Sequence, residues 1–241
     1  MQTKSSLIVR DLTKSYGDFV AINKISFKVP SNGIFGLLGT NGAGKTTLIG
    51  MILGLIKPSS GSISIFEKPF EKNKSYILKR INFESPYVDL PKKLTVKQNL
   101  VFYSRLYGIN NYLENIEFLS EGLKIEELLN KKFGTLSAGQ KTKVGICKSL
   151  INSPKLLLLD EPTSSLDPET SIFIRNFLVK YQKKMKSSII IASHNMIEVE
   201  KICERIILLK GGSIVVEGKV NDLLVKKKKR NLEQLFIEIC G

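Results

Sequence analysis

A glycine-rich stretch that ends in lysine and two threonines is the first feature of the chain able to do chemistry. Residues 39–47 read Gly-Thr-Asn-Gly-Ala-Gly-Lys-Thr-Thr and fill the pattern G-x-x-x-x-G-K-[ST] between a predicted strand and a predicted helix. Glycines let such a loop wrap so that its backbone N–H groups point at an anion, and the helix adds its positive dipole end. The residues predicted to bind phosphate are Gly39, Asn41, Gly42, Ala43, Gly44, Lys45, Thr46 and Thr47.

Two members of this loop have more specific predicted roles. Lys45 is expected to contact the oxygens of the two terminal phosphates of a nucleotide and to act as a catalytic residue. The hydroxyl of Thr46 is expected to ligate Mg²⁺. A glycine turn that merely precedes a helix is the alternative interpretation.

An acidic pair follows a run of four leucines. The run at 156–159 is apolar enough for a strand that is buried on both faces, and Asp160 and Glu161 stand at its carboxyl end. Neighbouring side chains at a strand end point in different directions, so the two carboxylates can have separate roles. We expect Asp160 to hold Mg²⁺ and Glu161 to be the general base that polarises an attacking water. Two solvated acids are the alternative.

The elements that must position these groups are short apolar runs that alternate with segments of helical period. The runs lie at 6–9, 25–29, 34–38, 62–66, 155–160, 188–193, 204–209 and 213–218. Runs as uniformly apolar as 156–159 suit a parallel sheet covered by helices on both faces, so the predicted fold class is α/β. The last two runs flank Gly211 and Gly212 and predict a hairpin.

Two segments have helical rather than strand character. Between about 86 and 152 the apolar residues follow mixed three- and four-residue spacing without a convincing buried strand, which predicts a helical insertion. A final helix that docks onto the parent domain is indicated by an i, i+3, i+4, i+7 pattern of Leu232, Leu235, Phe236 and Ile239.

Composition excludes several classes of protein. The chain has 241 residues, of which 42% are hydrophobic and 24% charged, so wholesale disorder and coiled-coil architecture do not fit. No aliphatic run approaches the ~20 residues that cross a bilayer, and the N-terminus lacks the apolar stretch of a secretory signal. We therefore expect a cytoplasmic protein. Three cysteines and one histidine do not suit a zinc cluster or a disulfide framework, and we expect Cys147, Cys203 and Cys240 to be buried thiols.

Charge alone leaves the partner open. Lysine and arginine exceed aspartate and glutamate by 37 to 22, a net charge of +15, which attracts phosphate as nucleic acid, anionic lipid or nucleotide. Most of the basic residues are lysines that suit a solvated surface, and no motif that reads nucleic acid is present. A nucleic-acid partner is therefore not expected.

The chain resembles the ATP-binding cassette (ABC) family from about residue 6 to residue 224. The most diagnostic stretch is 136–140, Leu-Ser-Ala-Gly-Gln, a close variant of the family's LSGGQ signature that general P-loop enzymes lack. Residues 164–167, Ser-Ser-Leu-Asp, match the family's D-loop, and His194 matches its switch histidine. Tyr16 falls where the family places an aromatic ring that stacks on adenine.

The resemblance implies one ABC ATPase domain over 1–241 with a P-loop NTPase (RecA-like) core and N-terminal antiparallel β elements. The core would comprise 1–85 and 153–222, the helical signature subdomain 86–152, and a C-terminal amphipathic helix 223–241. ATP and Mg²⁺ are the implied cofactors.

The resemblance also implies a nucleotide-sandwich dimer of two copies of this chain. Ser137 and the backbone N–H of Gly139 would contact the γ-phosphate of the ATP held by the opposite copy, and Gln140 and Asp167 would belong to the same nucleotide-binding set. His194 would donate a hydrogen bond to the γ-phosphate and orient the attacking water as a catalytic residue.

One stretch departs from the family pattern. The family's Q-loop glutamine is expected about eight residues before the LTV segment, and an ungapped count from Leu94 reaches Pro86 instead. Glu84 and Ser85 are both candidates to replace its contact with Mg²⁺ or water. The sequence does not decide between them.

A single cassette with the segment 85–100 and no spanning helix is similar to subunits that serve separate integral-membrane permeases of the type-2 export class. Such a subunit hydrolyses ATP at the cytoplasmic face of the membrane, held there by its permease. The loop after Pro86 would dock the permease through exposed Tyr87, Val88 and Leu90, unless these side chains pack within the helical insertion.

Two further alternatives concern partners. The basic run at 226–230 either lies near anionic lipid or is a solvated linker. A soluble ABC-type ATPase of translation, DNA repair or cofactor assembly competes with the transporter subunit, although such proteins commonly carry two cassettes or a long coiled-coil insertion.

Overall fold

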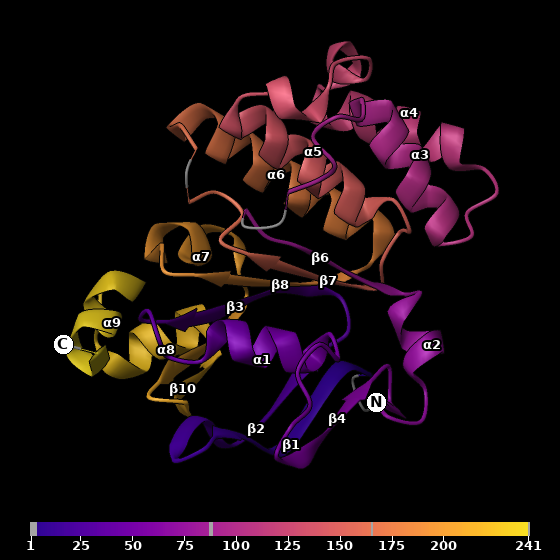
Figure 1. Cartoon of the computed structure of the whole chain (residues 1–241). Helices are drawn as coiled ribbons and strands as arrows, with labels where there is room; N and C mark the ends of the chain where they lie inside the picture. Colours follow the sequence, from indigo (N-terminus) through magenta and orange to yellow (C-terminus); the bar gives the residue numbers. More distant parts are fainter. Residues whose placement is uncertain (1–3, 87–88, 165, 241) are drawn as a thin grey trace.

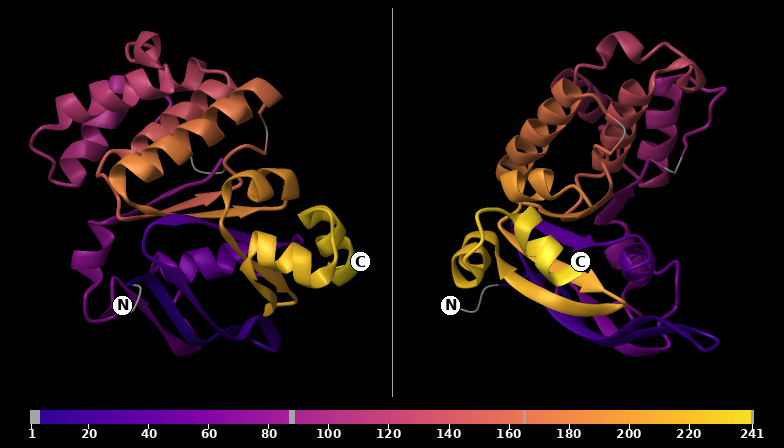
Figure 2. Two further views of the ribbon diagram at one scale, coloured as in Figure 1. Left: turned by 180° about the vertical axis from the view of Figure 1, so that it is seen from behind. Right: turned by 90° about the vertical axis from the view of Figure 1, so that its left-hand side faces the viewer.

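Two β-sheets and a layer of helices make up the architecture of the computed structural model (Figure 1). It describes residues 4–86, 89–164 and 166–240, with side chains up to residue 239. Figure 2 shows the helical layer on one side of the central sheet and the N-terminal sheet on the other. The predicted α/β fold is confirmed.

The N-terminal sheet is antiparallel. Its strands are β1 (Ser5–Tyr16), β2 (Phe19–Pro30), β4 (Ser60–Ile65) and β5 (Lys68–Pro69), in the order β2-β1-β4-β5. β1 and β2 are joined by a tight turn that pairs Tyr16 with Phe19. The long hairpin brings the Tyr16–Phe19 end toward the end of the central sheet where the glycine-rich loop begins, since Ala21 of β2 lies against Gly44.

The central sheet has the order β10-β9-β3-β8-β7-β6. Its strands are β3 (Gly33–Gly39), β6 (Ile81–Glu84), β7 (Leu156–Asp160), β8 (Ser188–Ser193), β9 (Arg205–Lys210) and β10 (Ser213–Lys219). All neighbours pair in parallel except β9 and β10, which form the predicted hairpin. The apolar runs predicted at 34–38, 155–160, 188–193, 204–209 and 213–218 form strands of this sheet, whereas the runs at 6–9, 25–29 and 62–66 form strands of the antiparallel N-terminal sheet.

β6 is the strand of the central sheet that no apolar run predicted. It has four residues, Ile81-Asn82-Phe83-Glu84, and its two polar side chains break the apolar run that marks the other parallel strands. Asn82 is nevertheless buried, because its amide donates to the side chain of Asn152 at 2.9 Å. A satisfied hydrogen bond lets a polar residue occupy an interior strand at little cost.

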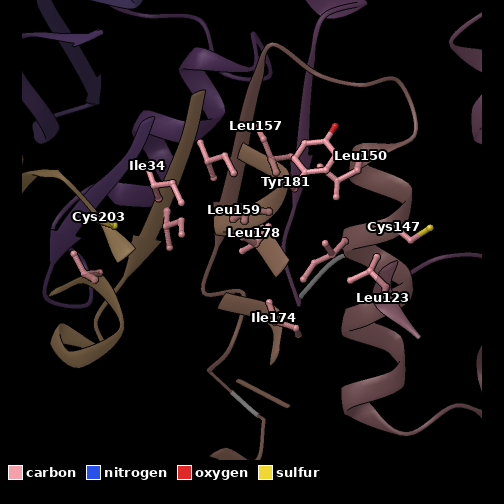
Figure 3. Close-up of a cluster of buried hydrophobic side chains, with 14 of the residues drawn as sticks. Ile34, Leu123, Cys147, Leu150, Leu157, Leu159, Ile174, Leu178, Tyr181 and Cys203 are labelled. Carbon is pink, nitrogen blue, oxygen red and sulfur yellow. The ribbon is translucent and has the colours of Figure 1, made fainter. Parts of the chain in front are cut away.

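Alternation along the strands divides the apolar interior into two clusters. Leu157 and Leu159 of β7 face the helical layer, whereas Leu156 and Leu158 face the N-terminal sheet and helix α1. Figure 3 shows the first cluster, in which side chains of the strands meet Ile174 and others from the helices. Full burial of one such leucine or isoleucine contributes about 1.5–3 kcal/mol to the stability of the fold. The central sheet is therefore stabilised by apolar packing on both faces.

The helices cover both faces of the central sheet. On one side lies α1 (Lys45–Ile52), and on the other lie α3 (Val96–Leu106), α4 (Tyr112–Leu123), α5 (Ala138–Leu150) and α6 (Pro168–Met185) (Figure 1). Shorter elements are α2 (Lys74–Leu78), α7 (Met196–Ile202) and the 3-10 turns Glu126–Leu128 and Phe133–Thr135. Among the described residues, 89–152 contain no strand, only an isolated bridge between Thr95 and Lys132.

The C-terminal segment differs from the single helix predicted over 223–241. It contains the end of α8 (Val220–Lys227) and the whole of α9 (Leu232–Cys240). The break falls inside the basic run, where Lys228 adopts φ +51° and ends α8. In a continued helix Lys226 would lie beside Lys229 and Arg230, at i+3 and i+4, where like charges are destabilising, which favours a turn. α9 docks on α7, with buried Leu232 and Leu235, as the apolar pattern predicted.

The structure bears on the predicted state of the cysteines and on the search for a membrane-spanning segment. Cys147 and Cys203 are buried free thiols, as predicted, and burial raises the pKa of Cys147 to about 12. The side chain of Cys240 lies outside the described residues. Within the described ranges, no helix is both long and apolar enough to cross a membrane.

Candidate functional site

A cleft of about 400 Å³ opens where β3, β7 and β8 end. The carboxyl ends of parallel neighbours meet at one edge of a sheet, which is why groups far apart in sequence converge here. The side chains and backbone that line the cleft belong to Phe19, Ala21, Thr40, Asn41, Gly42, Ala43, Gly44, Lys45, Thr46, Thr47, Asp160, Glu161, Ser164 and His194. The structure thus brings the predicted loop, the acidic pair and the histidine into one site.

The glycines of the loop are required by its backbone. Gly42 and Gly44 have φ of +78° and +102°, a region that other residues rarely adopt. A Cβ on Gly44 would lie 2.7 Å from the carbonyl oxygen of Ala21 and 2.6 Å from Ile22 Cδ1. The loop therefore winds tightly against β2 and leads directly into α1, whose N-terminal N–H groups face the cleft.

Lys45 is the cation of the cleft. It is almost fully buried, and its ammonium donates hydrogen bonds to the carbonyl oxygens of Gly39 at 2.7 Å and Thr40 at 3.3 Å. Burial lowers the pKa of Lys45, while the carboxylates of Glu161 and Asp160 raise it in part. An ammonium held in this way is prepared to bind an anion that enters the loop.

Thr46 and Asp160 offer oxygen atoms from two sides of the cleft. Asp160 ends β7 and is buried, and burial followed by the nearby Glu161 charge raises its pKa, whereas Lys45 lowers it. A carboxylate and a hydroxyl are ligands that suit Mg²⁺, which usually keeps several waters and phosphate oxygens in its shell. These two residues therefore fit the predicted magnesium site.

Glu161 and His194 form the closest pair of ionisable groups in the cleft. The Nδ1 atom of His194 lies 2.7 Å from Glu161 Oε1, and the backbone N–H of His194 donates to the same oxygen at 3.0 Å. Glu161 has φ +51°, so the chain turns sharply after β7 and aims its carboxylate at the end of β8. A neutral imidazole has one N–H, so donating to both Glu161 and a phosphate requires the imidazolium form.

The aromatic residue in the cleft differs from the one singled out in the sequence. Phe19 lines the cleft, whereas Tyr16 does not, although the two residues are paired across the β1–β2 turn. The Tyr16 ring is half exposed and has Lys14 Nζ 4.7 Å from its centroid. Phe19 was missed because it is the first residue of β2, directly after a turn and outside any recognisable pattern, and only the hairpin places it near the loop.

The residues of the signature stretch do not line this cleft. Ser137 caps α5, accepting from the Gln140 backbone N–H at 3.3 Å, and the Gln140 side chain accepts from Ser137 N–H at 3.0 Å. This reciprocal pair is a capping box, which fixes the start of the helix. A Cβ on Gly139 would make ordinary van der Waals contact with Thr170 and Leu166, the nearest atom being 3.7 Å away.

Asp167 also begins a helix outside the cleft. It caps α6 by accepting from Thr170 N–H at 2.8 Å, which lowers the pKa of its carboxyl. The neighbouring D-loop residue Ser165 lies outside the described residues. The N-termini of α5 and α6 are therefore capped by their own side chains and do not line the chain's own nucleotide cleft.

The predicted docking loop requires a correction. Leu90 was expected to be exposed, yet it is buried in the apolar cluster under the helical layer. Leu90 belongs to the same buried apolar cluster as Val96 and Leu100 of α3, so its side chain is not available to a partner. Tyr87 and Val88 lie outside the described residues.

Glu84 does not enter the nucleotide cleft. Its carboxylate is buried at the end of β6, and Lys148 Nζ of α5 lies 2.8 Å from Oε2 and donates to the Phe83 carbonyl oxygen at 3.0 Å. A Cβ on Gly145 would lie 2.2 Å from Glu84 Oε1, so α5 needs glycine there. Ser85 is also buried and does not line the nucleotide cleft. The Glu84–Lys148 ion pair connects the central sheet to the helix that begins at Ser137.

Lys148→Met is expected to lower the free energy of unfolding by about 3–5 kcal/mol at pH 7, because it leaves the Glu84 carboxylate buried without its counter-ion. Burial raises the pKa of Glu84 in the folded protein, and Lys148 lowers it. The cost should therefore be small near pH 4, where the carboxyl is protonated, and grow as pH rises through the folded pKa. Urea unfolding at both pH values measures this, with Lys143→Met on the same helix as the control. Equal losses at both pH values would contradict it.

The sequence of the chain is similar to those of known proteins. Residues 22–164 match the protein family described as ABC transporter. The Nod factor export ATP-binding protein I of Rhizobium etli is 36% identical over 216 residues, which cover 89% of this chain and 68% of that protein. The matched residues include both the phosphate-binding loop and the acidic pair.

Solved structures give the same result. An ATP-binding subunit of an ABC transporter has a TM-score of 0.90 at 25% identity, covering 98% of this chain and 100% of that chain. A dimeric ATP-binding cassette in a post-hydrolysis state, bound to ADP and Pi, has a TM-score of 0.80 at 25% identity and covers 88% of this chain and 98% of that chain. These likenesses confirm the predicted P-loop NTPase fold.

Proposed function

The chain belongs to the ABC transporter family, and from this premise we propose that it is the ATP-hydrolysing subunit of an exporter and powers a separate membrane permease. The observation that carries the proposal is the cleft in which Lys45, Asp160, Glu161 and His194 meet. The relative named for Nod factor export supports the direction of transport. The alternative of a soluble ATPase in translation, DNA repair or cofactor assembly is not favoured by that relative.

In the proposed reaction, the chain's own residues bind the triphosphate and prepare a water for attack. Backbone N–H groups of the loop 40–44 hold the phosphates, and Lys45 contacts the terminal phosphate oxygens. Glu161, oriented by His194, accepts a proton from the water as the water oxygen bonds to the γ-phosphorus, and the bond from that phosphorus to the bridging oxygen breaks so that ADP leaves. Mg²⁺ held by Thr46 and Asp160 would supply positive charge that stabilises the phosphate oxygens. The roles of these residues rest on their positions around one cleft.

A second copy of the chain is proposed to close the cleft. It would present Ser137, Gly139 and Gln140 at the N-terminus of its α5, together with Asp167 at the start of α6. These residues do not line the chain's own nucleotide cleft, which supports a role for them at the cleft of another copy. The dimeric cassette with ADP and Pi is similar to this chain and supports the same assembly.

The permease is proposed to dock on α3 instead of on Leu90. Phe102 and Leu106 lie one helical turn apart and are 54% and 68% exposed, in a groove that Lys97, Arg105 and Asn130 also line. An amphipathic segment with apolar residues and acidic flanks would match this groove. Docking there would hold the chain at the cytoplasmic face of the membrane. It would also connect the permease to α5, which packs against α3.

Co-purification from detergent-solubilised membranes tests the function. The tagged chain is expected to recover an integral-membrane subunit, and Phe102→Ser is expected to reduce that recovery about tenfold or more while ATP hydrolysis by the isolated chain stays near the wild-type rate. Phe118→Ser is the matched control, because Phe118 is an exposed phenylalanine on α4 outside the groove. Recovery of the wild-type chain only in soluble form would favour the soluble alternative. Equal recovery with Phe102→Ser would reject the α3 groove.

A further inference from the structure

A buried carboxyl group lies directly behind the proposed general base. Glu198 of α7 is only 1% exposed, and its Oε1 accepts a hydrogen bond from the Thr163 hydroxyl at 2.6 Å. Its Oε2 lies 3.2 Å from Ser193 Oγ, and the same Oγ lies 3.3 Å from Glu161 Oε2. One serine hydroxyl therefore stands between two carboxyl groups, one lining the cleft and the other sealed from solvent.

Two contacts join Ser193 Oγ to the two carboxyl groups, and each contact needs a hydrogen. Two ionised carboxylates and one serine hydroxyl supply only one. Ser193 Oγ already accepts from the backbone N–H of Asn195 at 3.0 Å and has a single hydrogen to donate. It can satisfy Glu161 or Glu198, but not both. If both were ionised, one carboxylate oxygen would face the oxygen lone pairs of the hydroxyl, which is a repulsive contact in a dry interior.

The environment of each carboxyl decides which one carries the proton. Glu161 receives the backbone N–H and the ring nitrogen of His194 on its other oxygen and remains partly exposed. Glu198 has only neutral hydroxyl partners. Burial raises the pKa of Glu198, and the Glu161 charge raises it further, while Thr163, Ser193 and the Arg175 charge on α6 lower it. Burial raises the pKa of the Cys203 thiol, directly after α7, and Glu198 and Glu204 raise it further.

We propose that Glu198 is a positioning residue that stays protonated and donates to Ser193, whose hydroxyl in turn donates to Oε2 of Glu161. Both oxygens of Glu161 then have donors, so its carboxylate is fixed in rotation toward the attacking water. The bond from Thr163 to the same buried group holds the chain that leaves Glu161 toward the D-loop. The inference rests on the proposed function, because it assigns a role only if Glu161 acts on water.

Three substitutions separate this role from general packing. Glu198→Ala removes the donor, and we expect kcat for ATP to fall about tenfold or more while KM changes less than about twofold, because a misplaced base affects the chemical step. Glu198→Gln replaces the O–H donor by an N–H donor, and kcat should stay within about threefold of the wild type. Ser193→Ala breaks the chain between the carboxyl groups, and kcat should fall as in Glu198→Ala.

The pH profile supplies a readout that packing alone would not move. The alkaline decline of the wild-type kcat should combine loss of the proton from Glu198 with loss of the imidazolium form of His194, and Glu198→Gln should change that decline because only the His194 component is left. If Glu198→Gln lowers kcat as much as Glu198→Ala, or has the same alkaline profile as the wild type, the proposal is overturned. Glu200→Gln is the control, since Glu200 lies on the same helix and accepts instead from Leu232 N–H at 2.6 Å.

The design also distinguishes this inference from the proposed function. Glu161→Gln is measured in the same assay. If that variant keeps wild-type turnover, the assignment of the base fails and this inference fails with it. If Glu161→Gln is inactive while Glu198→Gln behaves like Glu198→Ala, only the protonated state of Glu198 is wrong. Should Glu198→Ala not fold, the other two variants give the same decision. The proposal requires kcat to fall in Ser193→Ala and to stay near the wild-type value in Glu198→Gln.

Discussion

Replacing Lys45 with alanine is expected to weaken ATP binding at least ~100-fold, which corresponds to about 2.7 kcal/mol. The ammonium is buried at the base of the loop, where it donates to the carbonyl oxygens of Gly39 and Thr40. It is the cation that lines the cleft through a side chain, and Asp160 and Glu161 line the same cleft with negative charge. Without Lys45, a triphosphate would meet two carboxylates and no lysine or arginine among the described residues that line the cleft, so binding should weaken strongly even though the loop N–H groups and His194 remain.

Isothermal titration calorimetry with ATP and Mg²⁺ measures this effect directly. Lys28→Ala is the control, because Lys28 is an exposed lysine of β2 away from the cleft. A thermal unfolding scan of both variants separates loss of binding from loss of folding. Micromolar affinity retained by a folded Lys45→Ala protein would reject the phosphate-binding role of the loop.

The parts of the site that the sequence predicted share one property, which is that their geometry is local. The spacing of glycines and Lys45 dictates a loop between a strand and a helix, and four leucines before Asp160 dictate a buried strand with acids at its end. Parallel strands then bring the ends of β3, β7 and β8 together, so Glu161 and His194 meet although 33 residues separate them.

The parts that the sequence did not predict depend on contacts between distant elements. Phe19 lines the cleft because the β1–β2 hairpin lies against the glycine-rich loop. Glu84 does not line the cleft, and its carboxylate forms an ion pair with Lys148 of α5. Glu198 looks like an ordinary charged residue in a helix until the fold buries it between Thr163 and Ser193. Single-sequence patterns carry no information about such pairings, since neither periodicity nor motif spacing links the partners.

Missed secondary structure has a similar cause. β6 is short and contains Asn82, whose burial is tolerated through the side chain of Asn152, 70 residues away. The single helix expected at the C-terminus divides because Lys228 lies in a run of like charges, while the apolar pattern on either side continues. In both places a polar or charged side chain changed the secondary structure that the apolar pattern predicts. Asn82 did so through a distant hydrogen-bond partner, and Lys228 through the like charges beside it.

Glu161→Gln is expected to reduce the rate of ATP hydrolysis by about 10²–10⁴-fold, the usual contribution of a general base, while ATP still binds. The amide keeps the shape of the carboxylate and can still accept from the His194 N–H, so the cleft should stay intact. It cannot take a proton from water. Loss of one negative charge beside Asp160 also reduces repulsion of the γ-phosphate, which should favour the ATP-bound dimer.

Two measurements decide this prediction. Steady-state phosphate release gives the turnover rate, and size-exclusion chromatography with ATP and Mg²⁺ should show the variant accumulating as a dimer where the wild type turns over and dissociates. Glu169→Gln is the matched control, because Glu169 is an exposed glutamate in the first turn of α6. Turnover equal to the wild type would remove Glu161 from the reaction. A dead variant that stays monomeric with bound ATP would keep the base but reject the nucleotide-sandwich dimer, because slowed hydrolysis should preserve any assembly that ATP holds together.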